Sequence, residues 1–126
     1  MTNRMVLLPG PKHPITVNPA GVRVVVRVHG QVIADTTSAL TLHEADYPAV
    51  LYLPREDVDM SLLERSTSDS YCPFKGDAAY YSIPAAGEQG IDAVWTYEAP
   101  YDAVGAIKDY LAFYTNRAAS VEELPL

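Results

Sequence analysis

The residues best suited to chemistry are a cysteine and a lysine that lie three positions apart. Cys72 is followed by Pro73 and then by Lys75. An ammonium group near a thiol lowers the pKa of that thiol, and the thiolate is the reactive form. The sequence offers no partner base nearby, and a buried cysteine that packs as a small hydrophobic residue is the alternative. Cys72 is thus the one candidate catalytic residue, through its thiol.

Aromatic residues form a second group with chemical potential. Trp95 and Tyr97 lie two positions apart, so on a strand their side chains share one face. Tyr80 and Tyr81 are adjacent, so one of them can join that face. Aromatic walls with cationic tips suit a planar or anionic small ligand. The predicted ligand-binding set is Tyr52, Arg55, Lys75, Tyr81, Trp95 and Tyr97.

The same aromatic residues could instead form a seam of the core, with their polar tips at its rim. Three functions therefore stay open. The first, which we favour, is a small-molecule-binding domain with an aromatic pocket. The second is a small enzyme that uses Cys72 or a carboxylate in that pocket. The third is a structural or interaction module, such as a homodimer joined at a sheet edge.

The residues that commonly hold metals show no suitable spacing. His13, His29 and His43 lack a pattern such as H-x-x-x-H. Asp57 and Asp59 form the only D-x-D, and either of them is expected to cap a short helix over residues 60–65. A single cysteine excludes an intramolecular disulfide and a zinc site of paired cysteines. We therefore expect neither a metal nor another cofactor.

Length and charge limit the partners. The chain has 126 residues, which suits one domain over residues 1–126, and a net charge of −7. Its nine Lys and Arg residues are scattered, so no basic patch for a nucleic acid is expected. No stretch approaches the roughly 20 apolar residues of a membrane span. The four apolar residues from Met5 to Leu8 are too few for a signal peptide, so we expect a cytoplasmic protein with no membrane partner.

Alternating apolar residues predict about six short strands joined mostly by tight turns. The expected strands cover residues 22–28, 32–35, 39–44, 50–53, 78–83 and 91–97. Helices do not alternate with strands, which favours antiparallel sheets that form an open barrel or cross each other.

The two ends of the chain look different from this strand-rich middle. Residues 1–21 contain four prolines and are expected to form an extended arm over the domain. Pro100 is expected to open an amphipathic helix, because Val104, Ile107, Leu111 and Tyr114 recur at helical spacing. Residues 115–126 are expected to be a frayed tail.

Several segments together resemble the family catalogued as domain of unknown function 427, which is sometimes filed under a nucleotidyltransferase-like heading. They are Arg27–Gly30 with Val32–Asp35, Leu51–Val58, Cys72–Gly76 with Tyr80–Tyr81, Val94–Pro100 and Ile107–Tyr114. The opening Gly10–Ile15 is similar as well. Nucleotidyl transfer needs carboxylates that hold Mg²⁺ and usually a Gly-Ser turn, and no Gly-Ser precedes the D-x-D here.

The resemblance implies a mainly β fold, α+β in class, with antiparallel sheets in a β-tent-like open barrel and one C-terminal amphipathic helix. In a β-tent, two roughly orthogonal antiparallel sheets meet along an edge. Related β-tent proteins often hold zinc with paired cysteines, which this chain lacks. The same group includes domains that hold a small ligand in an aromatic pocket, and this analogy of fold agrees with the function that we favour.

Overall fold

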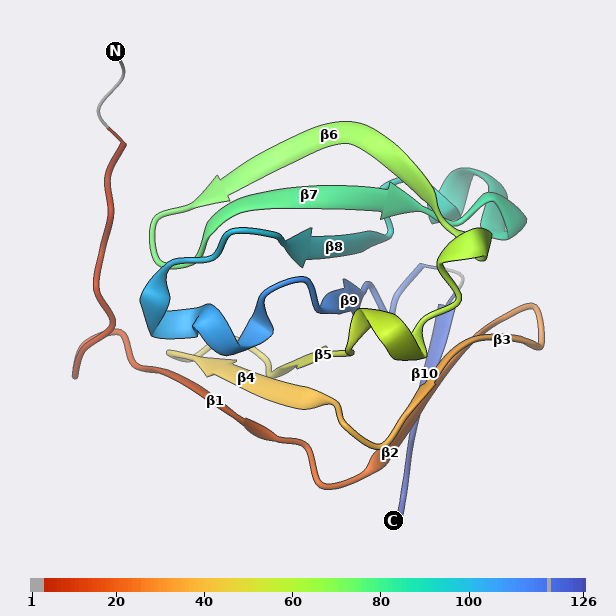
Figure 1. The fold of residues 1–126 in the computed structure, drawn as a ribbon, viewed down its shortest axis with the longest axis horizontal. Coiled ribbons are helices and arrows are strands. Elements are labelled where there is room, and N and C mark those ends of the chain that lie inside the picture. The colour runs from red at the N-terminus through yellow and green to blue at the C-terminus, as the bar shows by residue number, and fades with distance from the viewer. Residues whose placement is uncertain (1–3, 118) are drawn as a thin grey trace.

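The computed structural model describes residues 4–117 and 119–126, which form antiparallel strands and short 3-10 helices (Figure 1). The strands are β1 (Ile15–Pro19), β2 (Arg23–Val28), β3 (Gln31–Thr36), β4 (Leu40–Glu44), β5 (Val50–Tyr52), β6 (Glu64–Cys72), β7 (Gly76–Ser82), β8 (Val94–Tyr97), β9 (Leu111–Phe113) and β10 (Ala119–Leu124). The 3-10 helices are η1 (Arg55–Asp57), η2 (Met60–Leu62), η3 (Pro84–Gly90) and η4 (Asp102–Ile107). The expectation of a mainly β protein with antiparallel sheets is confirmed.

The strands form three sheets, with the orders β1-β4-β5, β10-β2-β3 and β6-β7-β8-β9. Two of these sheets meet where β5 runs into β9. There the amide of Leu53 donates to the carbonyl of Leu111, and the amide of Leu111 donates back, each over 2.8 Å. This pair of hydrogen bonds joins the edge of the first sheet to the edge of the third, and no closed barrel results.

Two hydrophobic cores lie on opposite faces of β8. The first core contains Val94 of β8 and inward-facing residues of β2 and β3, including Val26 and Ile33. The second core contains Tyr97 of β8 together with Leu42 of β4. Because successive side chains of a strand point to opposite faces, one short strand serves both cores. The two cores hold β8 from both sides.

The helix expected over residues 101–114 is wrong. The segment forms η4, then a turn with Asp109 at φ 64°, and then β9. The apolar residues are buried as the spacing suggested, but on different elements. Val104 and Ile107 of η4 pack in the second core, whereas Leu111 of β9 packs in the first. A 3-10 helix, a turn and a strand can bury the same residues as an α-helix, so the spacing of the apolar residues alone could not distinguish these structures.

The ends of the chain also differ from expectation. Residues 115–126 are not a frayed tail, because they contain β10, which pairs antiparallel with β2 and places Val121 opposite Val26. The proline-rich arm is partly a strand, since β1 pairs with β4. Before β1 the arm runs along the domain, where the amide of Leu7 donates to the carbonyl of Pro73 over 3.0 Å.

Two further elements complete the comparison. The predicted helix over residues 60–65 is shorter, because η2 ends at Leu62, but Asp59 caps it by accepting a hydrogen bond from the amide of Ser61 over 3.1 Å. Strand β6 was not expected, because its sequence ERSTSDSYC is polar and shows no apolar alternation. In the described ranges no helix has the length and hydrophobicity to cross a membrane.

The second core should depend on Ile107, which is 0% exposed. We expect Ile107→Ala to lower the free energy of unfolding by about 2–5 kcal/mol, because the truncation leaves a cavity. Urea denaturation measures the loss. The adjacent exposed variant Lys108→Ala is the control and should stay within about 0.5 kcal/mol of wild type. Equal losses for the two variants would contradict the placement of Ile107 in this core.

Candidate functional site

The pairing of β8 with its neighbours decides which chemical groups can meet. Trp95 lies opposite Tyr80 of β7, whereas Val94 lies opposite Tyr81. Residues directly opposite each other in an antiparallel pair project to the same face. Tyr80 therefore shares the face of Trp95, and Tyr81 lies on the other face. Trp95 and Tyr97 share one face as predicted, but the structure does not bring Tyr81 to them.

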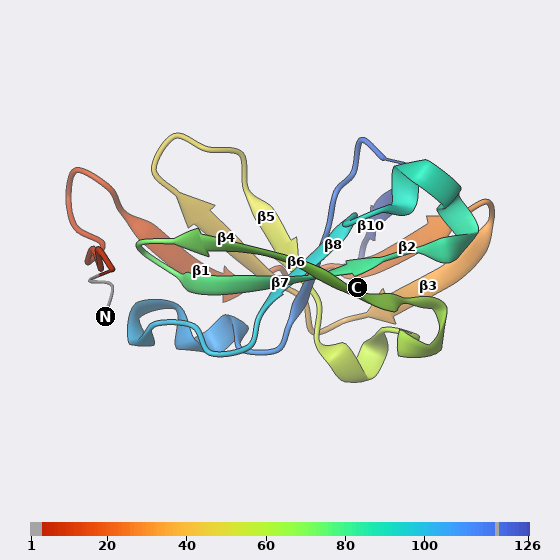
Figure 2. The same ribbon diagram turned by 90° about the horizontal axis from the view of Figure 1, so that it is seen from above.

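A groove lined by Trp95 and by residues that pack in or against both hydrophobic cores opens beside β8. It has a volume of about 830 Å³. Its walls include the β4–β5 loop and the segment after β9, and Figure 2 shows both connections rising on one side of the molecule. The lining residues are Val26, Thr41, Glu44, Tyr47, Pro48, Ala49, Val50, Leu51, Leu53, Trp95, Phe113, Tyr114, Thr115, Asn116, Val121 and Glu123. We call this feature the aromatic groove.

Trp95 is held in place at the aromatic groove by two neighbours. Its indole Nε1–H donates to the hydroxyl oxygen of Tyr52 over 3.2 Å. The ring centroid of Tyr114 lies 4.6 Å from that of Trp95, with the planes tilted by 47°. The hydroxyl of Tyr52 stays protonated at neutral pH, because burial raises its pKa to about 12. These two contacts fix the orientation of the indole.

Tyr52 and Tyr97 support the groove rather than line it. Tyr52 is 1% exposed, and both residues belong to the second core. Burial also raises the pKa of Tyr97 well above its usual value. For these two residues the core alternative matches the structure. The role that we predicted for them in ligand contact has no geometric support.

The charged residues in the lining of the aromatic groove are both acidic, Glu44 and Glu123. Glu44 is occupied, because Lys75 donates to it from Nζ and His13 Nε2 lies 2.8 Å from its carboxylate. Burial raises the pKa of Glu44, but the hydrogen bonds with Lys75 and His13 outweigh burial and lower it overall. Phe74 stacks on His13 at 3.9 Å between centroids. Lys75 therefore does not line the groove itself, but it contacts the lining residue Glu44.

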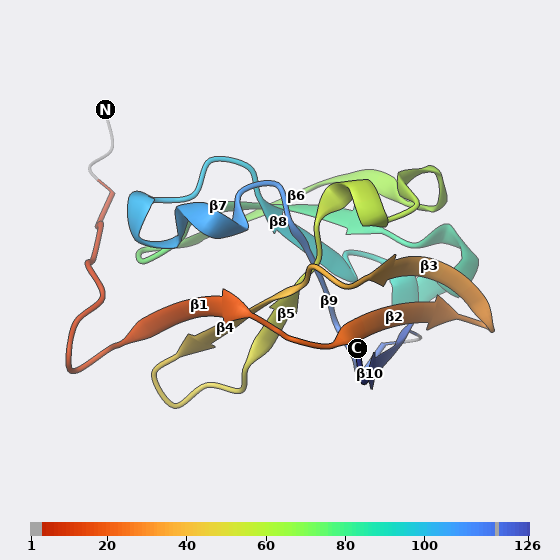
Figure 3. The same ribbon diagram turned by 60° about the horizontal axis from the view of Figure 1, so that its bottom comes forward.

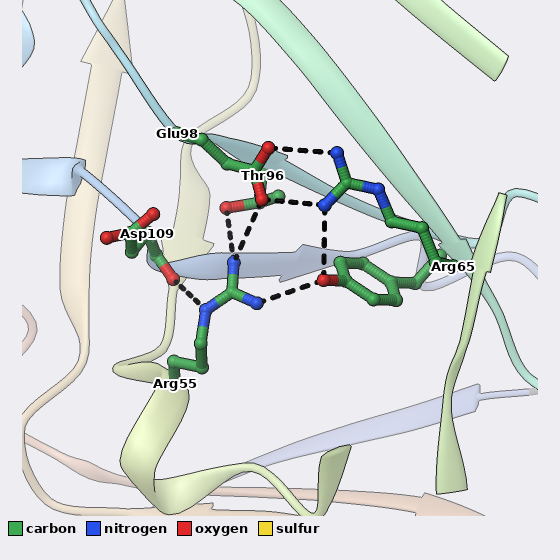
Figure 4. Close-up of polar contacts among 6 residues, drawn as sticks. Arg55, Arg65, Thr96, Glu98 and Asp109 are labelled. Atoms are coloured by element: carbon green, nitrogen blue, oxygen red, sulfur yellow. Dashed lines mark hydrogen bonds and ion pairs between the residues drawn. The ribbon is translucent and has the colours of Figure 1, made fainter. Parts of the chain in front are cut away.

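The opposite face of β8 carries a polar cluster (Figure 4). We call it the arginine cluster, and its members are Arg55, Arg65, Tyr81, Thr96 and Glu98. Arg65 on β6 donates two hydrogen bonds, of 2.7 and 2.9 Å, to the carboxylate of Glu98. The hydroxyl of Tyr81 accepts from Nη1 of Arg55 over 3.1 Å and from Nη1 of Arg65 over 3.4 Å. Two cations therefore converge on one phenol oxygen.

Arg55 extends from η1 to Thr96 of β8 and to Asp109, which precedes β9. Its Nε donates to the carbonyl of Asp109 over 3.2 Å, and its Nη2 donates to the hydroxyl of Thr96 over 3.4 Å. Its ion pair with Glu98 is long, at 3.9 Å. Thr96 is 0% exposed, so its hydroxyl is a buried polar group. Arg55 makes many contacts here, but none of them is short.

The guanidinium groups lower the pKa of both acidic side chains in the arginine cluster, Glu98 and Tyr81. The hydrogen bond from Arg65 lowers the pKa of Glu98, which burial alone would raise. Burial raises the pKa of Tyr81, but the hydrogen bonds from Arg55 and Arg65 outweigh it and lower this pKa below the usual value of 10. The cluster therefore stabilises negative charge on oxygen atoms.

Sequence reasoning missed four residues of the aromatic groove and the arginine cluster. Arg65 lies on the unrecognised strand β6, and Tyr114 was assigned to the expected helix. Thr96 and Glu98 could have been found, because the alternation in WTYE places them opposite Trp95 and Tyr97. The missing signal was the strand pairing that adds Tyr81 and Arg65 to that face.

The other candidate groups lie apart from both sites. Cys72 ends β6, half-buried against the second core, and no His or carboxylate of the described chain forms a hydrogen bond with its thiol. Asp57 accepts from the hydroxyl of Thr36 over 2.7 Å, and Asp59 caps η2. Within residues 4–117 and 119–126, no three His, Cys, Asp or Glu residues are grouped so that they could hold a metal.

Comparison with models of protein families gives a match that spans most of the chain. The model of a family described as a domain of unknown function (DUF427) matches residues 16–123. No curated protein matches the chain. The matched range covers both sites, and the sequence segments that carry the resemblance supply Arg55, Tyr81, Thr96 and Glu98 to the arginine cluster from three separate stretches.

The hydrogen bonds of Glu44 should make the free energy of unfolding depend on pH in the acidic range. Because the folded-state pKa of Glu44 lies below its unfolded value of 4.5, its contribution is complete above about pH 4.5 and is lost as the pH falls through the folded value. We expect Glu44→Gln to cost about 1–3 kcal/mol at pH 7 by leaving Lys75 without its counter-ion. The difference from wild type should shrink below pH 4.5.

Chemical denaturation between pH 3 and 7 measures this difference. The exposed variant Glu56→Gln removes the same charge and is the control. A difference between wild type and Glu44→Gln that is constant with pH, or equal to that of the control, would contradict the role of Glu44.

Proposed function

We propose that this chain, which belongs to the family described as a domain of unknown function (DUF427), binds a small, flat molecule in the aromatic groove. The observation that carries the proposal is the position of Trp95. Its indole is only half-buried although it lies among apolar residues, and it lines the groove beside Tyr114. A large aromatic side chain that is accessible in a concave site is a typical platform for a ligand.

The dimensions and rigidity of the groove support this proposal. A volume of about 830 Å³ lies within the usual range for small-molecule sites, roughly 300–1,000 Å³. The hydrogen bond to Tyr52 fixes the indole from behind, so little side-chain freedom is lost when a ligand stacks on it. Such preorganisation favours binding because fewer rotamers must be ordered.

The charge of the lining selects among ligands. Lys75 and Arg55, which we expected beside an anionic group, are not among the lining residues. Glu123 is exposed at the groove, and the chain as a whole carries a charge of −7. An anionic ligand would be repelled, whereas the faces of Trp95 and Tyr114 attract cations as well as neutral rings. We therefore infer that the ligand is a neutral or cationic aromatic molecule.

We further infer that the sheets are arranged as in a β-tent. The reciprocal hydrogen bonds between Leu53 and Leu111 support this, because they join β1-β4-β5 to β6-β7-β8-β9 along an edge. In Figure 3, β6 and β7 form a layer above β1 and β4. The aromatic groove then lies beside the junction of the two sheets, since Leu53 is one of its lining residues.

Trp95 is the only tryptophan, so its fluorescence reports on the groove without interference. We expect a screen of aromatic compounds to yield saturable changes in this emission from neutral and cationic members. Tyr114→Ala keeps the reporter and removes one wall, and it should weaken each hit by roughly tenfold, about one lost aromatic contact.

Tyr71→Ala is the matched control, because this tyrosine bonds to Tyr101 and lies outside the lining. It should leave the affinities unchanged, provided that circular dichroism shows both variants folded. Hits that are all anionic would overturn the inferred ligand class. Hits that bind Tyr114→Ala as well as wild type, or no hits at all, would overturn binding in the groove.

A further inference from the structure

We propose that the arginine cluster is a second binding site, for an oxyanion of the carboxylate or phosphate type. Its strand residue Thr96 lies on the face of β8 opposite Trp95, and no member of the cluster lines the aromatic groove, so it does not depend on the function proposed above. The geometry points to this ligand class through unbalanced charge, unused hydrogen-bond donors and access from solvent.

The charge of the arginine cluster is unbalanced. It contains two guanidinium groups, Arg55 and Arg65, and one carboxylate, Glu98. That carboxylate is committed to Arg65 by the two short hydrogen bonds. Asp109 gives Arg55 only its carbonyl oxygen, and Figure 4 shows its carboxylate pointing away. Among residues 4–117 and 119–126, one positive charge therefore remains without a close counter-ion, in a protein whose net charge is −7.

Arg55 carries that remaining charge. Its hydrogen bonds to neutral oxygens measure 3.1–3.4 Å, and its distance to Glu98 is 3.9 Å. Charge-assisted hydrogen bonds between guanidinium and oxyanions are shorter, typically about 2.7–2.9 Å. A bound oxyanion could therefore form bonds with Arg55 that no protein group now forms. The present contacts hold the guanidinium in position for it.

One hydroxyl group of the cluster, that of Tyr81, has a proton to offer to a ligand. The oxygen of Tyr81 accepts from both arginines, neither of which can accept a proton in return. In the described part of the chain, the hydroxyl proton of Tyr81 has no acceptor. A ligand oxygen beside Arg55 would accept from Tyr81 and thereby complete its hydrogen bonding.

The site is also open to solvent. The side chain of Arg65 is 53% exposed and that of Arg55 is 31% exposed. An anion can reach both guanidinium groups from solvent, and the hydroxyl of the buried Thr96 contacts Arg55. An exposed site with converging cationic donors suits a small anionic group rather than a large apolar ligand.

Nuclear magnetic resonance tests this site with inorganic phosphate and with acetate as probes. We expect one of them to shift the Arg55 Nε–Hε resonance in a saturable way, with chloride at equal ionic strength as the reference. The same anion should raise the pKa of Tyr81, followed at its ring Cζ, because bound negative charge disfavours the phenolate. The probe with the higher affinity distinguishes a phosphate site from a carboxylate site.

Arg55→Gln should weaken that binding by about tenfold or more, since a charge-assisted contact is lost. Its Tyr81 pKa should rise and no longer respond to the anion. Arg23→Gln is the control, because it removes the same charge from the exposed ion pair between Arg23 of β2 and Asp35 of β3. Tyr81→Phe removes the hydroxyl donor and should weaken binding while Arg55 still reports on it.

Two results would overturn the proposal. One is the absence of a saturable effect of either anion on wild type beyond that of chloride. The other is an effect that Arg55→Gln and Arg23→Gln reduce equally. Tyr114→Ala keeps the Trp95 reporter and leaves the arginine cluster intact, so weakened groove binding in that variant with anion binding unchanged would show that the two sites bind independently.

Discussion

The alternation of side chains along β8 is the constraint on which both proposed sites depend. Four residues place an indole and a phenol on one face and a valine and a threonine on the other. Each face packs against its own core, so the strand cannot slip by one residue without exchanging both sets of side chains. The separation of aromatic and cationic chemistry follows from this.

The two faces then acquire different electrostatic characters. On the Trp95 side, Lys75 and His13 pair with Glu44, and the exposed Glu123 leaves the groove weakly acidic. On the Thr96 side, Arg55 and Arg65 outnumber the one carboxylate. A single pocket that uses aromatic walls and cationic tips together is therefore not what this chain forms. The structure separates the predicted set into groove, core and cluster.

Much of the fold could be predicted, because β2 and β4 show an alternation of apolar residues and β8 is rich in strand-forming residues. Strand β6 could not, since its exposed polar residues gain their structure from pairing with β7 rather than from burial. The residues Val104, Ile107 and Leu111 misled because burial in two different cores happened to match a helical period. The choice of Tyr81 over Tyr80 required a register that no single segment contains.

The separation of the two sites is the central claim, and one nuclear magnetic resonance spectrum can test it. The indole Nε1–H of Trp95 and the Nε–H of Arg55 are both visible in a nitrogen-15 correlation spectrum. The probe that binds more tightly of phosphate and acetate should move the Arg55 resonance and leave the Trp95 resonance in place, and an aromatic cation such as phenyltrimethylammonium should do the reverse. Movement of both resonances along one saturation curve, with either probe, would show a single site and contradict the account.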